Sequence, residues 1–227
     1  MSHEACNYMI SLASHKGNPY LGVYCSASKK HAFVPTGTDN ALVETIERSM
    51  SVDVVRMSIG GTTIIGSLIA SNSKGVVISN LASKKELEIM PDHLEVAIME
   101  EKYNAAGNNI LVTDRAALVH PGVSKDTIET LKDVFGVEVH KGTIANISTV
   151  GSISIATGKG IVCHPRATEE DIQMLKDVFS VPVTLATLNY GNPWLGACAI
   201  GNDNGAVIGD KSTPIEIGKI EDGLNLI

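Results

Sequence analysis

The sequence repeats itself at intervals of about 44 residues, and a motif near its N-terminus returns near its C-terminus. Gly17-Asn18-Pro19-Tyr20-Leu21-Gly22 reappears 174 residues later as Gly191-Asn192-Pro193-Trp194-Leu195-Gly196, an offset of about four repeat lengths. A fixed internal period indicates one supersecondary unit that is used again and again. The spacing of the two motifs therefore predicts a ring that the chain closes on itself.

Each copy carries the pattern of a hairpin. The first strand is expected to open near a residue that recurs at steps of 42 to 45: Gly22, Gly66, Asn109, Gly151 and Gly196. A turn follows, and an apolar residue lies three positions after it: Phe33, Ile78, Val119, Cys163 and Ile208. The second strand is expected to stop two residues later, at residues that form strands poorly: Pro35, Asn80, Pro121, Pro165 and Asp210.

After the hairpin, the apolar period changes from that of a strand to that of a helix. Ser124 and Thr168 lie where an N-cap oxygen would satisfy free backbone N–H groups, and Asp171 completes a capping-box pattern with Thr168. Leu-Lys-Asp-Val-Phe occurs identically at 131–135 and 175–179, with its apolar members on one helix face. A short alternating run ends the unit, so each unit is predicted to read strand, strand, helix, strand.

The fifth unit stops before its last strand. Its helix, at about 215–224, almost reaches Ile227, whereas Tyr8–Ala13 aligns at an offset of 174 residues with the third strand of the fourth unit. We expect this N-terminal segment to pair with the fifth unit and close the ring, because closure removes an exposed sheet edge. The prediction is a single α/β domain over 1–227 with pseudo-fivefold symmetry and these approximate repeats: 20–64, 65–107, 108–150, 151–194, and 195–227 together with 5–14.

The charge balance constrains the partners. The chain has 18 Lys and Arg residues against 25 Asp and Glu, a net charge of −7. An acidic surface repels phosphate, which disfavours a general nucleic-acid binder, predicts no binding of free DNA and favours a basic protein partner. The hairpin turns hold several cations, which form either a local basic patch or simply solvated turns: Lys29, Lys30, Lys74 and Arg115.

The same sequence favours a cytoplasmic protein. No apolar run approaches the roughly 20 residues that a membrane helix needs, so no membrane partner is expected. The first six residues lack the basic and apolar stretches of a signal peptide. Because a closed ring needs no partner to complete its sheets, a monomer is expected.

Signals for catalysis, cofactors or metals are weak. Cys198 occupies a position that other repeats fill with apolar residues, so a buried thiol is expected. His120 and His164 each precede a proline and could be a paired metal site, but no Cys, Asp or Glu lies at ligand spacing. Gly60-Gly61 and Gly107 do not match a phosphate-binding loop and are expected to permit positive φ between repeats. The sequence therefore predicts no catalytic residue, cofactor or metal site.

Eight short segments, in order along the whole chain, resemble the translation initiation factor 6 family. They are Ser58-Ile59-Gly60-Gly61, Ile65-Gly66-Ser67, Asn72-Ser73-Lys74-Gly75, Gly107-Asn108, Ala117-Leu118-Val119-His120-Pro121, Val150-Gly151-Ser152, His164-Pro165 and Asn189-Tyr190-Gly191. Any one of them is nonspecific, but eight in register over five repeats form a specific pattern. The chain ends at Ile227 and is similar to the archaeal form of the family.

The resemblance implies the five-bladed pentein-type α/β propeller and an anti-association role. Members of that family bind the face of the large (50S) ribosomal subunit that meets the small (30S) subunit, beside a basic ribosomal protein and the sarcin-ricin loop. Their contact surface implies four ribosome-binding positions here: Thr63, Ser67, Ser73 and Asn108. Eukaryotic members carry arginines at the first three of these positions, and this chain does not.

Two other functions stay open at this point. The pentein fold also serves guanidine-modifying enzymes such as arginine deiminases and amidinotransferases, which use a cysteine near the C-terminus as the nucleophile. Cys198 is the candidate for that role, although no histidine stands at a matching first-strand position to activate it. A ring-shaped interaction scaffold of another kind is the remaining alternative.

Overall fold

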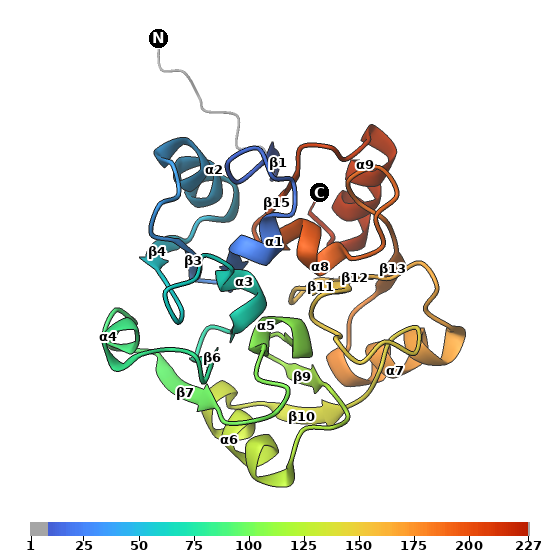
Figure 1. The fold of residues 1–227 in the computed structure, drawn as a ribbon. Coiled ribbons are helices and arrows are strands. Elements are labelled where there is room, and N and C mark those ends of the chain that lie inside the picture. The colour runs from blue at the N-terminus through green and yellow to red at the C-terminus, as the bar shows by residue number, and fades with distance from the viewer. Residues whose placement is uncertain (1–8, 227) are drawn as a thin grey trace.

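The computed structural model describes residues 9–226, which form five small three-stranded sheets around a central axis (Figure 1). In each sheet the middle strand pairs antiparallel with an inner strand, and it pairs parallel with an outer strand. This is the predicted pentein-like architecture of five repeats. The part of the predicted closing segment that precedes residue 9 lies outside the described residues.

The strands follow the same order in every blade. The inner strands line the axis: β2 (Ser26–Ala27), β5 (Ile69–Ser71), β8 (Ile110–Val112), β11 (Ser154–Ala156) and β14 (Ala199–Gly201). The middle strands are β3 (His31–Pro35), β6 (Gly75–Ser79), β9 (Ala116–Val119), β12 (Ile161–Cys163) and β15 (Ala206–Gly209). The outer strands are β4 (Asp53–Met57), β7 (Glu95–Met99), β10 (Glu138–Lys141), β13 (Val183–Leu185) and β1 (Ile10–Ala13).

One apolar position holds the same place in all five sheets. It lies on the middle strand, pairs with the inner strand and is completely buried: Phe33, Ile78, Val119, Cys163 and Ile208. The sequence prediction for these residues is confirmed. Because the strand register is the same in all five sheets, equivalent residues of the hairpins keep the same spacing along the chain although their sequences differ.

A peripheral helix follows the hairpin of each blade in the chain, and in the first four blades the outer strand follows the helix: α2 (Asn40–Met50), α4 (Lys84–Leu87), α6 (Lys125–Phe135), α7 (Glu169–Phe179) and α9 (Pro214–Gly223). The predicted N-caps are confirmed, since the side chains of Ser124 and Thr168 accept backbone N–H groups at the starts of α6 and α7. Thr168 and Asp171 form the predicted capping box.

Each long helix packs against the sheet of the preceding blade. Leu131 and Phe135 of α6 pack with Val77 of β6, for example, and Ile46 of α2 packs with Val207 of β15. The hydrophobic core is therefore divided into clusters that lie between neighbouring blades. Such an arrangement buries every helix only when the ring is complete.

The N-terminal strand closes the ring, as predicted. β1 pairs parallel with β15 over Ile10–Ala13, so the fifth sheet takes its outer strand from the other end of the chain. Figure 1 shows this N-terminal strand between α2 and α9. The fifth sheet thereby acquires the same three-stranded order as the other four.

The recurring glycines do not open the first strands, which corrects the sequence prediction. They lie three or four residues earlier, in one-turn helices: α1 (Leu21–Tyr24), α3 (Ile65–Leu68), α5 (Ala106–Asn109) and α8 (Leu195–Cys198), with a turn at 150–153 in the fourth blade. In the third blade the equivalent residue is Gly107, not Asn109. Gly107 is helical, so the expected positive φ is wrong for it but correct for Gly60 and Gly61.

The five glycines form a closed ring of backbone contacts. A Cβ added to any one of them would lie less than 3.0 Å from the carbonyl oxygen of the glycine in the preceding blade. The chain of contacts closes on itself in the order Gly22, Gly196, Gly151, Gly107, Gly66 and back to Gly22. Glycine therefore recurs once in each repeat because only glycine allows the blades to approach so closely.

We expect Gly196→Ala to destabilise the protein by about 3 kcal/mol or more, because the atom in its way is backbone that cannot rotate aside. At this chain length the melting temperature should fall by roughly 6–12 °C. Gly218→Ala is the matched control, since Gly218 lies within α9 with no atom within 4 Å of an added Cβ. That control should gain up to about 1 kcal/mol. Thermal melting that leaves Gly196→Ala as stable as the wild type would contradict the ring contact.

Candidate functional site

The ring has two ends that differ in chemistry. One end, here called the helix end, consists of the one-turn helices with the loops that lead into them, at 15–24, 59–68, 101–109, 144–153 and 188–198. The other, here called the hairpin end, consists of the four-residue turns between inner and middle strands, at 28–31, 72–75, 113–116, 157–160 and 202–205. The glycine ring narrows the axis at the helix end, and a cavity of about 160 Å³ opens between the hairpin turns.

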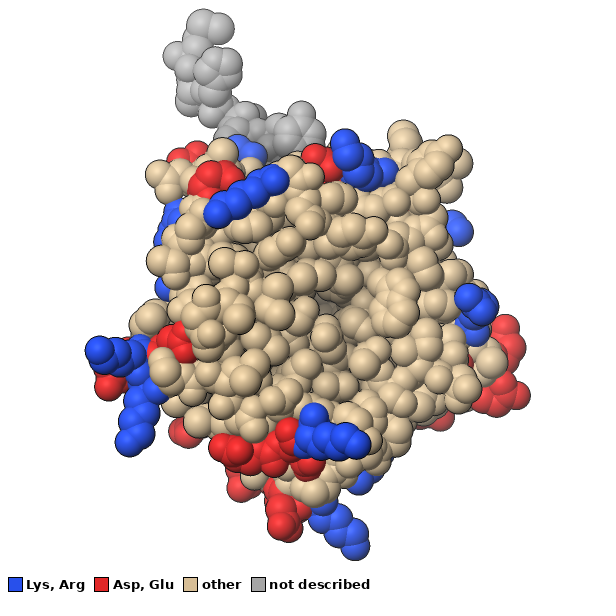
Figure 2. All heavy atoms as spheres, in the orientation of Figure 1, with Lys and Arg blue, Asp and Glu red and all other residues tan. Residues whose placement is uncertain are grey.

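The helix end is almost free of charge. Its five segments contain only three charged residues: Lys16, Glu101 and Lys102. Figure 2 shows charged side chains at the margins of this face, whereas its hollowed centre carries none. The aromatic residues are also divided between core and surface. Every Tyr and Trp between residues 9 and 226 lies in a helix-end segment, whereas all three Phe are buried in the core.

Three of the four sequence-predicted contact residues lie together at the helix end. Thr63 is exposed in the loop before α3, Ser67 is half-buried within α3, and Asn108 is half-buried within α5. The two helices pack directly, because Gly107 lies against the carbonyl of Gly66. Asn108 lies in a one-turn helix, where its carbonyl accepts the N–H groups of Gly151 and Ser152.

Ser73 is separated from the other three. It lies in the hairpin turn that follows β5, whereas α3 precedes β5, so the strand places Ser73 at the opposite end of the ring from Ser67. Its backbone N–H donates to the Asp114 carboxylate of the next hairpin at 2.8 Å. A partner that covers the helix end alone does not reach Ser73.

A buried carboxylate holds the loop that carries Thr63. Glu86, the third residue of α4, accepts the Ser58 hydroxyl at 2.6 Å and the N–H groups of Gly60 and Gly61 at 3.0 and 3.1 Å. It also accepts the N–H of Ser83 at 2.8 Å. Burial by itself would raise the pKa of Glu86, but the hydrogen bonds outweigh it and lower the pKa from 4.5 to about 2. The carboxylate is therefore ionised and fixes the turn.

The fourth and fifth blades use the same device. Glu216 accepts the Thr187 hydroxyl at 2.9 Å and the N–H of Gly191 at 2.7 Å. Asp171 accepts the N–H of Ala145 at 2.9 Å. In these blades the residue that completes the capping box of a peripheral helix also reaches the helix end of the ring. The sequence pattern identified the capping box of Thr168 but not this second contact, because the partners are about 25 residues away in the chain.

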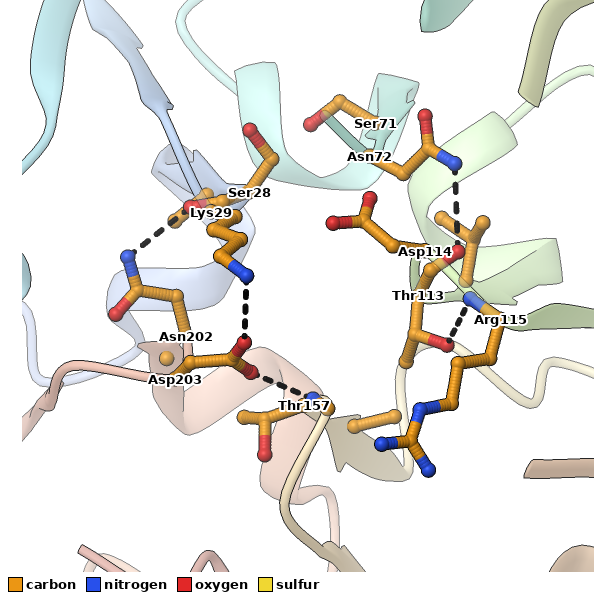
Figure 3. Close-up of a pocket in the computed structure, with 15 residues that line it drawn as sticks. Ser28, Lys29, Ser71, Asn72, Thr113, Asp114, Arg115, Thr157, Asn202 and Asp203 are labelled. Atoms are coloured by element: carbon orange, nitrogen blue, oxygen red, sulfur yellow. Dashed lines mark hydrogen bonds and ion pairs between the residues drawn. The ribbon is translucent and has the colours of Figure 1, made fainter. Parts of the chain in front are cut away.

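The hairpin end is polar and its groups are largely satisfied within the ring (Figure 3). Each turn starts with a Ser, Thr or Asn whose side chain accepts N–H groups of its own turn: Ser28, Asn72, Thr113, Thr157 and Asn202. Two of these also join neighbouring blades, since the amide of Asn72 donates to the carbonyl of Thr113 and that of Asn202 donates to the carbonyl of Ser28. Asp203 bridges Lys29 at 3.4 Å and the N–H of Gly158 at 2.6 Å.

Two cations of the hairpin turns, Lys74 and Arg115, contact the ends of neighbouring helices. The ammonium of Lys74 donates to the carbonyl of Gly136 at 3.3 Å, and the guanidinium of Arg115 donates to that of Ser180 at 3.4 Å. Gly136 and Ser180 are the C-cap residues of α6 and α7, so each cation meets the negative end of the neighbouring helix. Asn204 makes the equivalent contact to Met50, at the end of α2. The positions of Lys74 and Arg115 are therefore explained by contacts within the ring.

The cysteine and histidine candidates are part of the packing. Cys198 is fully buried in α8, and burial raises the pKa of its thiol to about 12, so it carries no thiolate at neutral pH. His120 and His164 each accept a backbone N–H through Nδ1, at 2.9 and 3.1 Å. Within residues 9–226, no group of three or more His, Cys, Asp or Glu is placed to hold a metal ion. No helix in the same range has the length and apolarity to span a membrane.

Comparison with known proteins gives one consistent family. The profile described as the eIF-6 family matches residues 10–223. The chain is 41% identical over 219 residues to a protein of Methanococcoides burtonii named translation initiation factor 6, which covers 95% of this chain and 99% of that protein. Proteins of the same name from Methanocella arvoryzae and Pyrococcus abyssi are 40% and 36% identical, each over 96% of this chain and 99% of their own length.

We expect Glu86→Gln to destabilise the protein by about 1–3 kcal/mol near pH 7, because the variant loses the ionised acceptor of four partly buried hydrogen bonds. The folded-state pKa of Glu86 lies below its ordinary value, so its stabilisation is present above about pH 4.5 and is lost as the pH falls towards 2. The difference in unfolding free energy between the wild type and Glu86→Gln, measured by urea titration, should therefore shrink over that range. Glu88→Gln, at an exposed position of the same segment, is the control. A constant difference across this pH range would contradict the role of the charge.

We expect Cys198→Ser to lower stability by about 1–3 kcal/mol, because the variant places a hydroxyl in an apolar site, while Cys198→Ala should cost less. Melting curves measure both changes. Incubation with arginine and related guanidines tests the enzymatic alternative. Turnover by the wild type that disappears in Cys198→Ser would support that alternative over a packing role.

Proposed function

The chain belongs to the eIF-6 family, and from that premise we propose that it binds the large (50S) ribosomal subunit and prevents its association with the small (30S) subunit. The relatives it matches over nearly their whole length are named translation initiation factors. A role in translation initiation is therefore the function of the family. Binding to the large subunit and the block to subunit joining are the proposal.

We propose the helix end as the docking surface, and its composition carries this assignment. An uncharged surface with exposed tyrosine and tryptophan side chains is typical of the centre of a protein–protein interface. Thr63, Ser67 and Asn108 lie on this surface, whereas the hairpin end uses its cations and carboxylates for contacts between blades. A factor docked in this way would block subunit joining sterically, with no chemical step.

The proposed partner is a basic ribosomal protein beside the sarcin-ricin loop. Acidic and basic side chains both lie around the margins of the helix end (Figure 2), and the net charge of −7 favours a basic partner. We propose that the protein acts as a monomer in the cytoplasm, with no enzymatic activity and no cofactor. It needs neither free DNA nor a membrane.

We expect Asn108→Lys to weaken binding to the large subunit by about tenfold or more, because a positive charge at the centre of the contact meets a basic partner and is desolvated. The fold should survive, because the hydrogen bonds of Asn108 use its backbone atoms. Cofractionation with purified archaeal 50S subunits in a sucrose gradient measures the loss, and renewed 70S formation reports the functional consequence.

Asn204→Lys is the matched control. It adds the same charge at the hairpin end, where Lys74 and Arg115 already occupy equivalent positions. The control should bind 50S subunits as the wild type does. Wild-type binding by a well-folded Asn108→Lys protein would reject the helix end as the docking surface, and cofractionation of the wild type with 30S subunits instead would reject the proposed function.

A further inference from the structure

The residue before each one-turn helix occupies an equivalent backbone position around the ring. In the four blades with a one-turn helix, its φ lies between −88° and −75° and its ψ between 55° and 79°, with no side-chain capping bond. These residues are Tyr20, Ile64, Ala105 and Trp194, and Thr149 takes the same place in the fourth blade. The fold therefore repeats one geometry with side chains of very different size.

The large members of this set are surface residues. Trp194 is 41% exposed, Ile64 39% and Tyr20 38%. In the third blade, Ala105 has the same backbone geometry with only a methyl side chain. In the fourth blade, Thr149 takes the same place in the repeat. The fold therefore does not require a large apolar side chain at this position. The repeat thus provides an internal control, and it indicates that the three large side chains are kept for contact with another molecule.

These three side chains lie on consecutive blades. Trp194 belongs to the fifth blade, Tyr20 to the first and Ile64 to the second, and α1 packs against both α8 and α3. Across the closure of the ring, the Tyr20 hydroxyl and the amide nitrogen of Asn192 are 3.1 Å apart. Tyr190, which is 85% exposed, lies in the same loop as Trp194. Tyr190, Trp194, Tyr20 and Ile64 are named the apolar crescent.

We propose that the apolar crescent is the anchor of the docking surface and that it binds an apolar patch on a protein of the large subunit. This inference rests on the proposed function and identifies the chemistry of its partner. Recognition of RNA phosphates depends on Lys and Arg, and the helix-end loops of the fifth, first and second blades offer only Lys16. Tyrosine and tryptophan at an uncharged surface are the residues that dominate binding energy at protein interfaces.

The test uses the whole protein with purified 50S subunits. We expect Trp194→Ala and Tyr20→Ala each to weaken binding by about 30-fold, the size of an interface hot spot. Val96→Ala is the control, because it removes an exposed apolar side chain of β7 where that strand pairs with Val76 beside the hairpin end, and it should change binding less than twofold, about the spread of surface substitutions. Melting curves establish that each variant is folded, because Trp194 and Tyr20 are 41% and 38% exposed and truncation also removes packing within the ring.

Two further measurements separate a protein partner from RNA. Raising KCl from about 100 to about 400 mM at constant Mg²⁺ should reduce wild-type binding by less than about fivefold, because few phosphates are contacted. Trp194 is the only tryptophan of the chain, so its fluorescence, measured against a Trp194→Phe background, should become protected from acrylamide when 50S subunits are added.

The outcomes distinguish the inference from the proposed function. Wild-type binding with unchanged affinity in Trp194→Ala and Tyr20→Ala would overturn the crescent and leave the proposed function standing. A steep salt dependence, together with binding of the wild type to protein-free 23S RNA, would assign the crescent to base stacking and overturn the protein partner. Failure of the wild type to bind 50S subunits, with Trp194 still open to acrylamide, would overturn both.

Discussion

The closed ring of five glycines is the contact on which the rest of the structure depends. Each glycine brings its Cα against the carbonyl of the glycine in the preceding blade, at a separation that leaves no space for a side chain. Because the last contact joins Gly22 to Gly196, the ring is completed by residues near opposite ends of the chain. The parallel pairing of β1 with β15 joins the same two parts of the chain. Closure of the ring therefore adds both the third strand of the fifth sheet and the final glycine contact.

The glycine ring also produces two unlike ends. It brings the one-turn helices together at one end, where backbone contacts leave the polar and aromatic side chains of the loops free to face outward. At the other end the hairpin turns are farther from the glycines, and side chains connect the blades instead: Asn72, Asp114, Asn202 and Asp203. The difference between a surface available for docking and a surface used for internal contacts therefore follows from where the backbone approaches most closely.

The internal repeat makes it possible to separate folding requirements from functional ones. A residue type that recurs in every blade, such as the central glycine or the buried middle-strand residue, is required by the repeated geometry. A residue that changes while the backbone stays the same is not. Lys74 and Arg115 have a folding role because they contact the ends of neighbouring helices, whereas Tyr20 and Trp194 exceed what their backbone position needs.

The sequence by itself determined the number of units and the order of elements, because these depend on apolar alternation and helix capping, which are local along the chain. It also determined the closure of the ring, because the copy of the N-terminal motif 174 residues later shows which unit lacks a strand. It located Phe33 and its equivalents in the core and Ser124 and Thr168 at helix starts. It also identified the family, since eight short motifs in register leave little ambiguity. It placed the glycines at strand starts because their partner is a carbonyl more than 40 residues away, which no local pattern reveals.

Only the tertiary structure decided which predicted residues share a surface. Thr63, Ser67, Ser73 and Asn108 are spread over 46 residues of sequence, and the three-residue strand β5 separates Ser73 from the others by sending it to the opposite end of the ring. The same holds for the apolar crescent. The Gly-Asn-Pro motifs were visible from the start, but their aromatic residues become neighbours only because closure brings the first and fifth blades side by side.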